Sequence, residues 1–199
     1  MTSIVLAGGR SSRLGKDKCI QVIAGKSALE RTISHLRSLS TEILIVISPR
    51  QSSSSFPSLN GTETVVDLHP GKGSLGGIYT GLMYSHSFYN LAVACDMPFL
   101  NTPLLRYMME LSPDFDVIIP RIGEFREPLH AIYTKNCLPR MEKLLSENNL
   151  KISNILDSVR VRNIEKEEID RLDPEHLSFF NINTLADLEK ARMLASEEK

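Results

Sequence analysis

The sequence has few cysteines, no long apolar run and almost no net charge. Its three cysteines form no Cys-x-x-Cys pair, so the pattern favours free thiols in a reducing cytoplasm over a disulfide scaffold or a zinc site. The longest aliphatic run covers residues 43–47, whereas a membrane-spanning helix needs roughly 18 apolar residues. The first residues lack the charged and apolar segments of a signal peptide. We therefore expect a cytoplasmic protein with no membrane partner.

The net charge excludes some partners and conceals a gradient. With 23 basic and 24 acidic residues the formal charge is −1, which makes bulk nucleic acid or an anionic membrane a poor partner. Residues 1–31 nevertheless hold six basic and two acidic side chains, while residues 165–199 hold five basic and ten acidic ones. Most of the basic surplus falls between residues 10 and 18. We expect a local cationic site in an otherwise balanced protein.

Short apolar runs alternate with helical patterns along 199 residues, which fits one domain over residues 1–199. The alternation predicts an α/β fold in three layers, with a mostly parallel central sheet covered on both faces by helices. Ligands of such sheets bind at the carboxyl ends of the strands. Strands are expected at 3–7, 42–47, 63–66, 91–94, 116–120 and 129–133, and helices at 74–85, at 137–147 and from residues 27, 102 and 184.

A glycine-rich basic loop follows the first predicted strand. Gly8 and Gly9 let backbone N–H groups converge on one point, and Arg13 and Lys18 add donors for phosphate oxygens, so the loop predicts a triphosphate site. It is not a Walker A loop, because five residues separate Gly9 from Gly15 and no Ser or Thr follows the lysine.

A second glycine pattern offers a rival interpretation. Residues 71–76 spell G-x-G-x-x-G, and Asp96 lies twenty residues further on, as in a dinucleotide fingerprint. Four residues, however, separate the preceding strand from Gly71, whereas the Rossmann turn starts at the end of its strand. The pattern favours a loop and helix start that admits a nucleotide or substrate beside the backbone, and a nicotinamide-binding protein is the rival.

Two carboxylates follow predicted strands. Asp96 ends an apolar strand, and a carboxylate there suits Mg²⁺ on nucleotide phosphates, since Mg²⁺ takes few protein carboxylates. Asn101 and Thr102 already supply the cap of the next helix, which favours the metal role for Asp96. Asp67 is a second ligand-contact candidate or a turn residue. Because no Ser/His/Asp or Cys/His set has a usable spacing, covalent catalysis is not expected.

Together these motifs resemble the molybdenum cofactor guanylyltransferases. Residues 6–18 resemble the LAGGxSxRMGxDK signature of that family. The sequence departs from it mildly: Leu14 replaces the usual Met, and Cys19 follows Lys18 where the family commonly has a small or apolar residue. The glycine-rich segment 73–81, the Cys-Asp-Met-Pro of residues 95–98 and the FxNxNT pattern of residues 180–184 follow in the family's order. Ser48 stands near the position of the family's guanine-contacting asparagine. The resemblance covers nearly the whole chain.

The resemblance implies a Rossmann-like nucleotidyltransferase fold and transfer of GMP from GTP to the molybdenum–molybdopterin cofactor, with Mg²⁺ as cofactor and release of pyrophosphate. Expected partners are GTP, molybdopterin and, transiently, cofactor-synthesis or molybdoenzyme proteins. The site residues it implies are Leu6, Ala7, Gly8, Gly9, Lys18, Asp67 and Asp96 for the nucleotide, Asp96 for the metal, Arg13, Lys18 and Asp96 for catalysis, and Gly76, Gly77, Asn181 and Asn183 for the second substrate.

Two other functions stay open at this point. One is a nucleotidyltransferase that uses CTP or a phosphorylated sugar-type acceptor, although Gly-Gly in the first motif is typical of the guanine branch. The other is a non-catalytic cofactor chaperone that binds GTP and pterin.

Overall fold

The protein is a three-layer α/β structure built around one large sheet. The computed structural model describes residues 1–8, 18–51 and 59–197. The strand order is β10-β7-β9-β6-β1-β4-β5, and β8 pairs with β7. The strands of this sheet are β1 (Thr2–Leu6), β4 (Glu42–Ile47), β5 (Glu63–Val66), β6 (Tyr89–Ala94), β7 (Val117–Ile122), β8 (Phe125–Arg126), β9 (His130–Thr134) and β10 (Val161–Ile164).

Most neighbouring strands run parallel, as expected. The exceptions are β9, which is antiparallel to both β6 and β7, and the short β8. The neighbouring pairings β6–β1, β1–β4 and β4–β5 are all parallel, so these four strands end at the same edge of the sheet.

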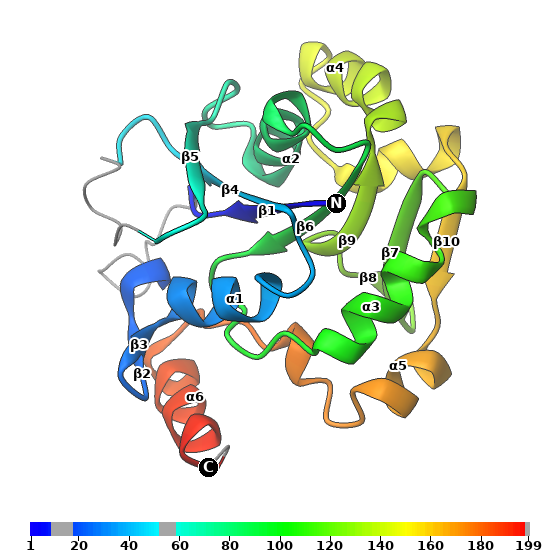
Figure 1. Ribbon diagram of the computed structural model, residues 1–199. Coiled ribbons are helices and arrows are strands. Elements are labelled where there is room, and N and C mark those ends of the chain that lie inside the picture. Colours follow the sequence, from blue (N-terminus) through cyan, green and yellow to red (C-terminus); the bar gives the residue numbers. More distant parts are fainter. Residues whose placement is uncertain (9–17, 52–58, 198–199) are drawn as a thin grey trace.

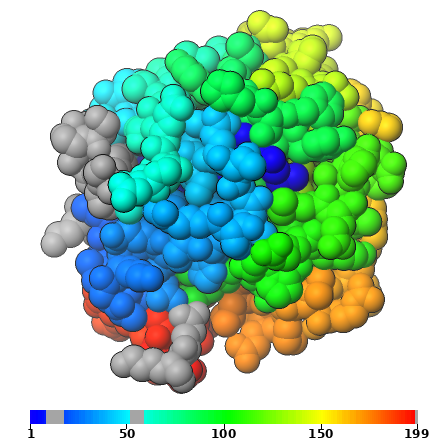
Figure 2. Space-filling view, viewed as in Figure 1, coloured from blue at the N-terminus to red at the C-terminus, as the bar shows by residue number. Residues whose placement is uncertain are grey.

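Helices cover both faces of the sheet, and a small third unit packs beside them (Figure 1). Helices α1, α3 and α5 share one apolar cluster, and α2 and α4 share the other. Helix α6 packs with the β2–β3 hairpin through a smaller cluster. The space-filling view shows the face built by the α1–β4 segment and by α3 (Figure 2). The bounds are α1 Ala28–Leu36, α2 Gly73–Tyr84, α3 Thr102–Glu110, α4 Leu138–Ser146, α5 Lys166–Leu172, α6 Leu185–Glu197, β2 Val22–Ile23 and β3 Lys26–Ser27.

The strands form where apolar residues run continuously, because each central strand is buried on both faces. In β1, Val5 faces the α1 cluster while Ile4 faces the α2 cluster, and Ile45 and Val46 of β4 divide in the same way. Burial of this kind contributes about 25 cal/mol per Å² of apolar surface. The two faces of the sheet therefore hold the main core of the protein.

Side-chain caps begin the helices where the sequence predicts them. Ser27 and Glu30 form a capping box at α1, and the Asn101 side chain accepts the N–H of Leu104 at α3. Before α6, the hydroxyl of Thr184 accepts the N–H of Asp187, and the carboxylate of Asp187 accepts the N–H of Thr184.

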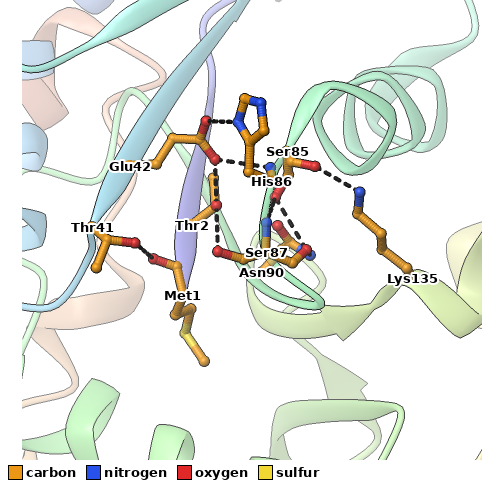
Figure 3. A network of polar contacts seen from close by, with 9 residues as sticks. All are labelled: Met1, Thr2, Thr41, Glu42, Ser85, His86, Ser87, Asn90 and Lys135. Atoms are coloured by element: carbon orange, nitrogen blue, oxygen red, sulfur yellow. Dashed lines mark hydrogen bonds and ion pairs between the residues drawn. The ribbon is translucent and has the colours of Figure 1, made fainter.

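Polar contacts join the first residues of the central strands at the edge opposite their carboxyl ends (Figure 3). Thr2 of β1 donates its hydroxyl to Glu42 of β4 at 2.5 Å, and Glu42 also accepts the backbone N–H of His86 at 3.1 Å. These hydrogen bonds hold the pKa of Glu42 below its usual range although burial opposes them. The network fixes the register of β1 and β4 at their amino ends.

The glycines of α2 allow the helix to lie directly on β1. A Cβ added at Gly81 would stand 2.3 Å from Cγ2 of Ile4, and one at Gly77 would stand 3.0 Å from Cδ2 of Leu6. Contacts this short leave no room for a methyl group, so the helix-to-strand distance depends on these positions.

Gly81→Ala is therefore expected to destabilise the fold by about 1–3 kcal/mol through overpacking. Urea denaturation would show a lower midpoint with an unchanged slope. Met83→Ala in the same helix is the matched control, since Met83 is 49% exposed. Equal midpoints for the two variants would contradict the packing argument.

The expectation of free thiols is wrong for two of the three cysteines. Cys19 and Cys95 form a disulfide with their Cα atoms 5.4 Å apart, while Cys137 is free and buried. The partners are separated by 76 residues in sequence, and only the fold brings the turn after the glycine loop beside the end of β6. None of the helices formed by the described residues is both long and apolar enough to cross a membrane.

Candidate functional site

A cleft of about 900 Å³ opens at the carboxyl ends of β1, β4, β5 and β6. This is the edge where parallel α/β sheets bind ligands, and the volume lies within the roughly 300–1,000 Å³ typical of small-molecule sites. Its walls come from both sequence-predicted motifs and unpredicted loops. The lining includes Ala7, Gly8, Lys18, Ser48, Asp67 and Asp96.

Backbone hydrogen bonds align the strand ends that form the floor of the cleft. Ala7 donates its N–H to Val46 at 2.9 Å, and Cys95 donates to Leu6 at 3.1 Å. At Gly8, an added Cβ would stand 3.0 Å from the backbone nitrogen of Ser48. Gly8 therefore lets the chain leave β1 in close contact with the end of β4.

The Gln51 side chain bridges the same two strand ends. Its Oε1 accepts the N–H of Ser48 at 2.9 Å, and its Nε2 donates to the carbonyl of Ala7 at 2.9 Å. The amide thereby occupies one backbone donor and one backbone acceptor on the cleft wall. A nucleobase edge could form the same kind of hydrogen bonds with this donor and acceptor. In this structure the Gln51 side chain forms them instead.

Asp67 lines the cleft after β5 and is held in place by its own loop and by α2. Its Oδ1 accepts the N–H of His69 at 2.9 Å and lies 3.0 Å from the hydroxyl of Thr80. These contacts are those of a turn residue. Asp67 also lines the cleft, so the turn role is observed and a contact with a ligand stays a prediction.

Asp96 and Lys18 face one another across the cleft. Lys18 Nζ lies 3.3 Å from Asp96 Oδ2, and the two side chains are only 23% and 14% exposed. Burial raises the pKa of Asp96, and the neighbouring Lys18 ammonium partly offsets that rise. The pair concentrates one anionic and one cationic group where β6 ends.

The segment that contains Asn181 and Asn183 lies beside this pair, although neither asparagine is among the residues that line the cleft. Ile182 is buried and donates its N–H to the carbonyl of Asp96 at 3.1 Å. Asn183 Oδ1 accepts a 2.5 Å hydrogen bond from Lys18 Nζ, so Lys18 contacts both expected substrate regions. The Asn181 side chain instead donates to the carbonyl of Phe179 at 2.9 Å.

The predicted site residues differ in where the structure places them. Asn181 and Asn183 are not among the residues that line the cleft; of the two, Asn183 contacts it through Lys18. Gly77 lines the cleft, whereas Gly76 packs under the loop, where an added Cβ would stand 2.8 Å from the carbonyl of His69. Gly9 and Arg13 lie outside the described residues. The residues that line the cleft as expected are Leu6, Ala7, Gly8, Lys18, Asp67 and Asp96.

No group of three or more metal-ligating His, Cys, Asp or Glu side chains occurs in the part of the chain that the structure describes. A dedicated cage is not what Mg²⁺ needs, since it binds through one or two carboxylates plus substrate phosphates. The largely buried carboxylate of Asp96, in the lining of a cleft of about 900 Å³, fits that requirement.

Sequence reasoning missed Gln51 and Arg50, which follow β4, and the role of Cys19 and Cys95 in the cleft wall. Arg50 adds a cation to the lining. Only their position in the sequence could have indicated them, because they follow strands whose ends are expected to bind ligands. A glutamine or arginine in a polar loop carries no distinctive pattern of its own.

Comparison with known proteins identifies relatives over the whole chain. The sequence pattern of the MobA-like NTP transferase domain matches residues 3–162. A probable molybdenum cofactor guanylyltransferase from Pelotomaculum thermopropionicum is 35% identical and covers 100% of this chain and 95% of its own. A molybdenum cofactor guanylyltransferase from Desulfosudis oleivorans is 33% identical and covers 96% and 94%.

Solved structures agree on the fold. Molybdopterin-guanine dinucleotide biosynthesis protein A from Archaeoglobus fulgidus superposes with a TM-score of 0.85 at 29% identity, covering 99% of this chain and 100% of its own. A cytidylyltransferase for 2-C-methyl-D-erythritol 4-phosphate from Thermus thermophilus reaches 0.71 at 15% identity, covers 98% of each chain and shows the fold alone.

Proposed function

The chain belongs to the molybdenum cofactor guanylyltransferase family of MobA-like NTP transferases, and on that premise we propose that it transfers GMP from GTP to the molybdenum–molybdopterin cofactor. The products are the guanine dinucleotide form of the cofactor and pyrophosphate. The observation that carries the proposal is that Lys18 contacts Asp96 inside the cleft at the strand ends and Asn183 beside it.

In the proposed reaction, a phosphate oxygen of molybdopterin attacks the α-phosphorus of GTP, and pyrophosphate leaves. The attacking group is already anionic, so no side chain needs to remove a proton. The chain contributes by positioning the two substrates and neutralising their charge. This agrees with a cleft whose described lining residues present charged and hydroxyl side chains but no nucleophile–base pair.

Lys18, Asn183 and Asp67 have distinct tasks in the proposed reaction. Lys18 contacts Asp96 on the nucleotide side and Asn183 on the pterin side, so its ammonium stands where the two phosphates meet. The Oδ1 of Asn183 is held by Lys18, which directs its amide N–H groups toward an acceptor on the second substrate. Asp67 and the backbone at Ala7 and Gly8 hold the nucleoside.

Asp96 is the residue that would hold Mg²⁺. The bound ion would neutralise charge on the nucleotide phosphates, which is its usual contribution to this class of transfer. In the free enzyme burial raises the pKa of Asp96, and the Lys18 ammonium, 3.3 Å from its carboxylate, partly offsets that rise. We place the protein in the cytoplasm, with GTP and molybdopterin as substrates and transient contacts to cofactor-synthesis or molybdoenzyme proteins.

A nucleotide panel tests the proposed function. Purified protein is incubated with molybdopterin, Mg²⁺ and GTP, CTP or ATP, and pyrophosphate release is measured. We expect release with GTP, with CTP and ATP at least about tenfold slower, since loss of one paired nucleobase contact costs about 1–3 kcal/mol. Release with CTP alone would assign the cytidine rival, and binding of GTP without release would assign the chaperone.

A further inference from the structure

The Cys19–Cys95 disulfide lies in the wall of the cleft, and each of its cysteines is the chain neighbour of one member of the Lys18–Asp96 ion pair. Lys18 precedes Cys19, and Asp96 follows Cys95. The covalent link and the ion pair thus join the same two segments. A bond in this place constrains the backbone positions from which both charged side chains extend.

The two segments differ in how firmly the fold holds them. The end of β6 is fixed by the hydrogen bond from Cys95 to Leu6 and by that from Ile182 to Asp96. Lys18, by contrast, begins a single 3₁₀ turn, Lys18–Ile20. When the disulfide opens, the two sulfurs must separate to non-bonded distance, and the short turn is the part that can move.

We propose that Cys19 and Cys95 form a redox-sensitive site whose disulfide pre-positions Lys18 beside Asp96 and thereby strengthens GTP binding, an inference that rests on the proposed function. Holding a flexible side chain in its binding position in advance removes part of the ordering cost of association. Opening the disulfide returns that cost to the binding step. Disulfides in a reducing compartment are usually transient, catalytic or redox-sensing, and the proposed cytoplasmic location places this one in that class.

The redox step needs a small dithiol that can enter the cleft. Its thiolate attacks the sulfur of Cys95, which is 6% exposed, and Cys19 leaves as a thiolate that takes up a proton. The second sulfur of the dithiol then attacks the mixed disulfide, which releases Cys95 as a thiol. Two electrons and two protons pass to the protein, and the dithiol becomes a cyclic disulfide.

The first measurement is the thiol count together with the affinity for GTP. Without reductant, denatured protein should expose one reactive thiol, that of Cys137, and after dithiothreitol treatment all three. Equilibrium dialysis should then give a Kd for GTP about three- to tenfold higher in the reduced protein, the cost of immobilising one long side chain.

Variants separate the disulfide from general effects of reduction. The Cys19→Ala/Cys95→Ala double variant cannot form the disulfide, so with or without reductant it should bind GTP like the reduced wild type. It should fold, because both positions lie in the apolar core and accept a small side chain. Cys137→Ser is the matched control and should keep the redox response. Thermal unfolding verifies that each variant is folded before its affinity is compared.

Linkage supplies a second, independent readout. If the disulfide form binds GTP more tightly by some factor, saturating GTP must shift the disulfide–dithiol equilibrium toward the disulfide by the same factor. The shift is measured by thiol labelling in a buffer of reduced and oxidised dithiothreitol. This readout does not depend on turnover.

The outcomes distinguish this inference from the proposed function. Three reactive thiols without reductant, or equal Kd values in the two redox states, would overturn the redox site and leave GMP transfer untouched. Failure of both redox forms to bind GTP would remove the proposed function, while the thiol count would still report whether the bond exists.

Discussion

Asp96→Asn is expected to lower kcat for GMP transfer by at least about 10³-fold, because a neutral amide loses the charge-based interaction with a phosphate-bound cation, which is worth several kcal/mol. The substitution keeps the size and one hydrogen-bonding oxygen of the side chain. Pyrophosphate release over a series of Mg²⁺ concentrations is the measurement, with GTP and molybdopterin saturating.

Loss of folding does not offer an alternative cause for this effect. Burial raises the pKa of Asp96 in the folded protein. A carboxyl whose pKa is higher in the folded than in the unfolded state lowers the free energy of unfolding at pH values above its unfolded pKa. Removing the charge should therefore leave the midpoint of thermal unfolding unchanged or higher at neutral pH. Asp157→Asn, at an exposed carboxylate, is the matched control. Near-normal turnover in Asp96→Asn would show that this carboxylate does not hold the metal.

Lys18→Met should have the second largest effect, a loss of about 10²–10³-fold in kcat, as when one pre-positioned donor is removed from a reacting centre. Methionine keeps much of the side chain's length and apolar body but cannot neutralise phosphate charge. Single-turnover measurements with preformed GTP complex separate this loss from weaker binding.

The control for Lys18 lies on the neighbouring hairpin. Lys26 is exposed in β3, so Lys26→Met removes the same charge from the same region without entering the cleft. We expect its kcat to stay within about twofold, in line with the small effects of surface changes. If both variants lost activity equally, the loss would come from the overall charge of the N-terminal region and not from a contact between Lys18 and the substrates.

Apolar periodicity predicted the elements that form the core. The runs at 3–7 and 42–47 became β1 and β4 within one residue, and the glycine-rich segment 74–85 became α2. The mostly parallel sheet and the three layers follow from the same alternation. These elements bury continuous apolar surface, which gives the strongest signal a single sequence carries.

The missed elements are those with little burial. Strand β10 has one buried residue, Ile164, and α5 has one, Ile169, so neither shows a usable period. The capping box of α5 uses Glu165, which is not a preferred capping residue. The β2–β3 hairpin has strands of two residues each and turns at Ala24 and Gly25, both with positive φ.

For the candidate site, strand ends were predictable but pairings were not. Asp67 and Asp96 could be assigned to one cleft because parallel strands end at one edge of the sheet. The contact of Lys18 with Asn183 and the bond of Cys19 with Cys95 join residues far apart in sequence. Side-chain pairings at such separations depend on tertiary packing, which one sequence does not reveal.

The hydrogen bonds that Asp96 and Lys18 form with residues 182 and 183 have a consequence for biosynthesis. Chains emerge from the ribosome at about 5–20 residues per second with their N-terminal parts first. The glycine loop and all sheet strands therefore leave the ribosome before the segment that completes the cleft. A nascent chain that stops at residue 162, where the match to the family pattern ends, lacks Asn183 altogether. The contacts that Asn183 and Ile182 make with Lys18 and Asp96 can therefore form only near the end of translation, and stalled or truncated products lack them.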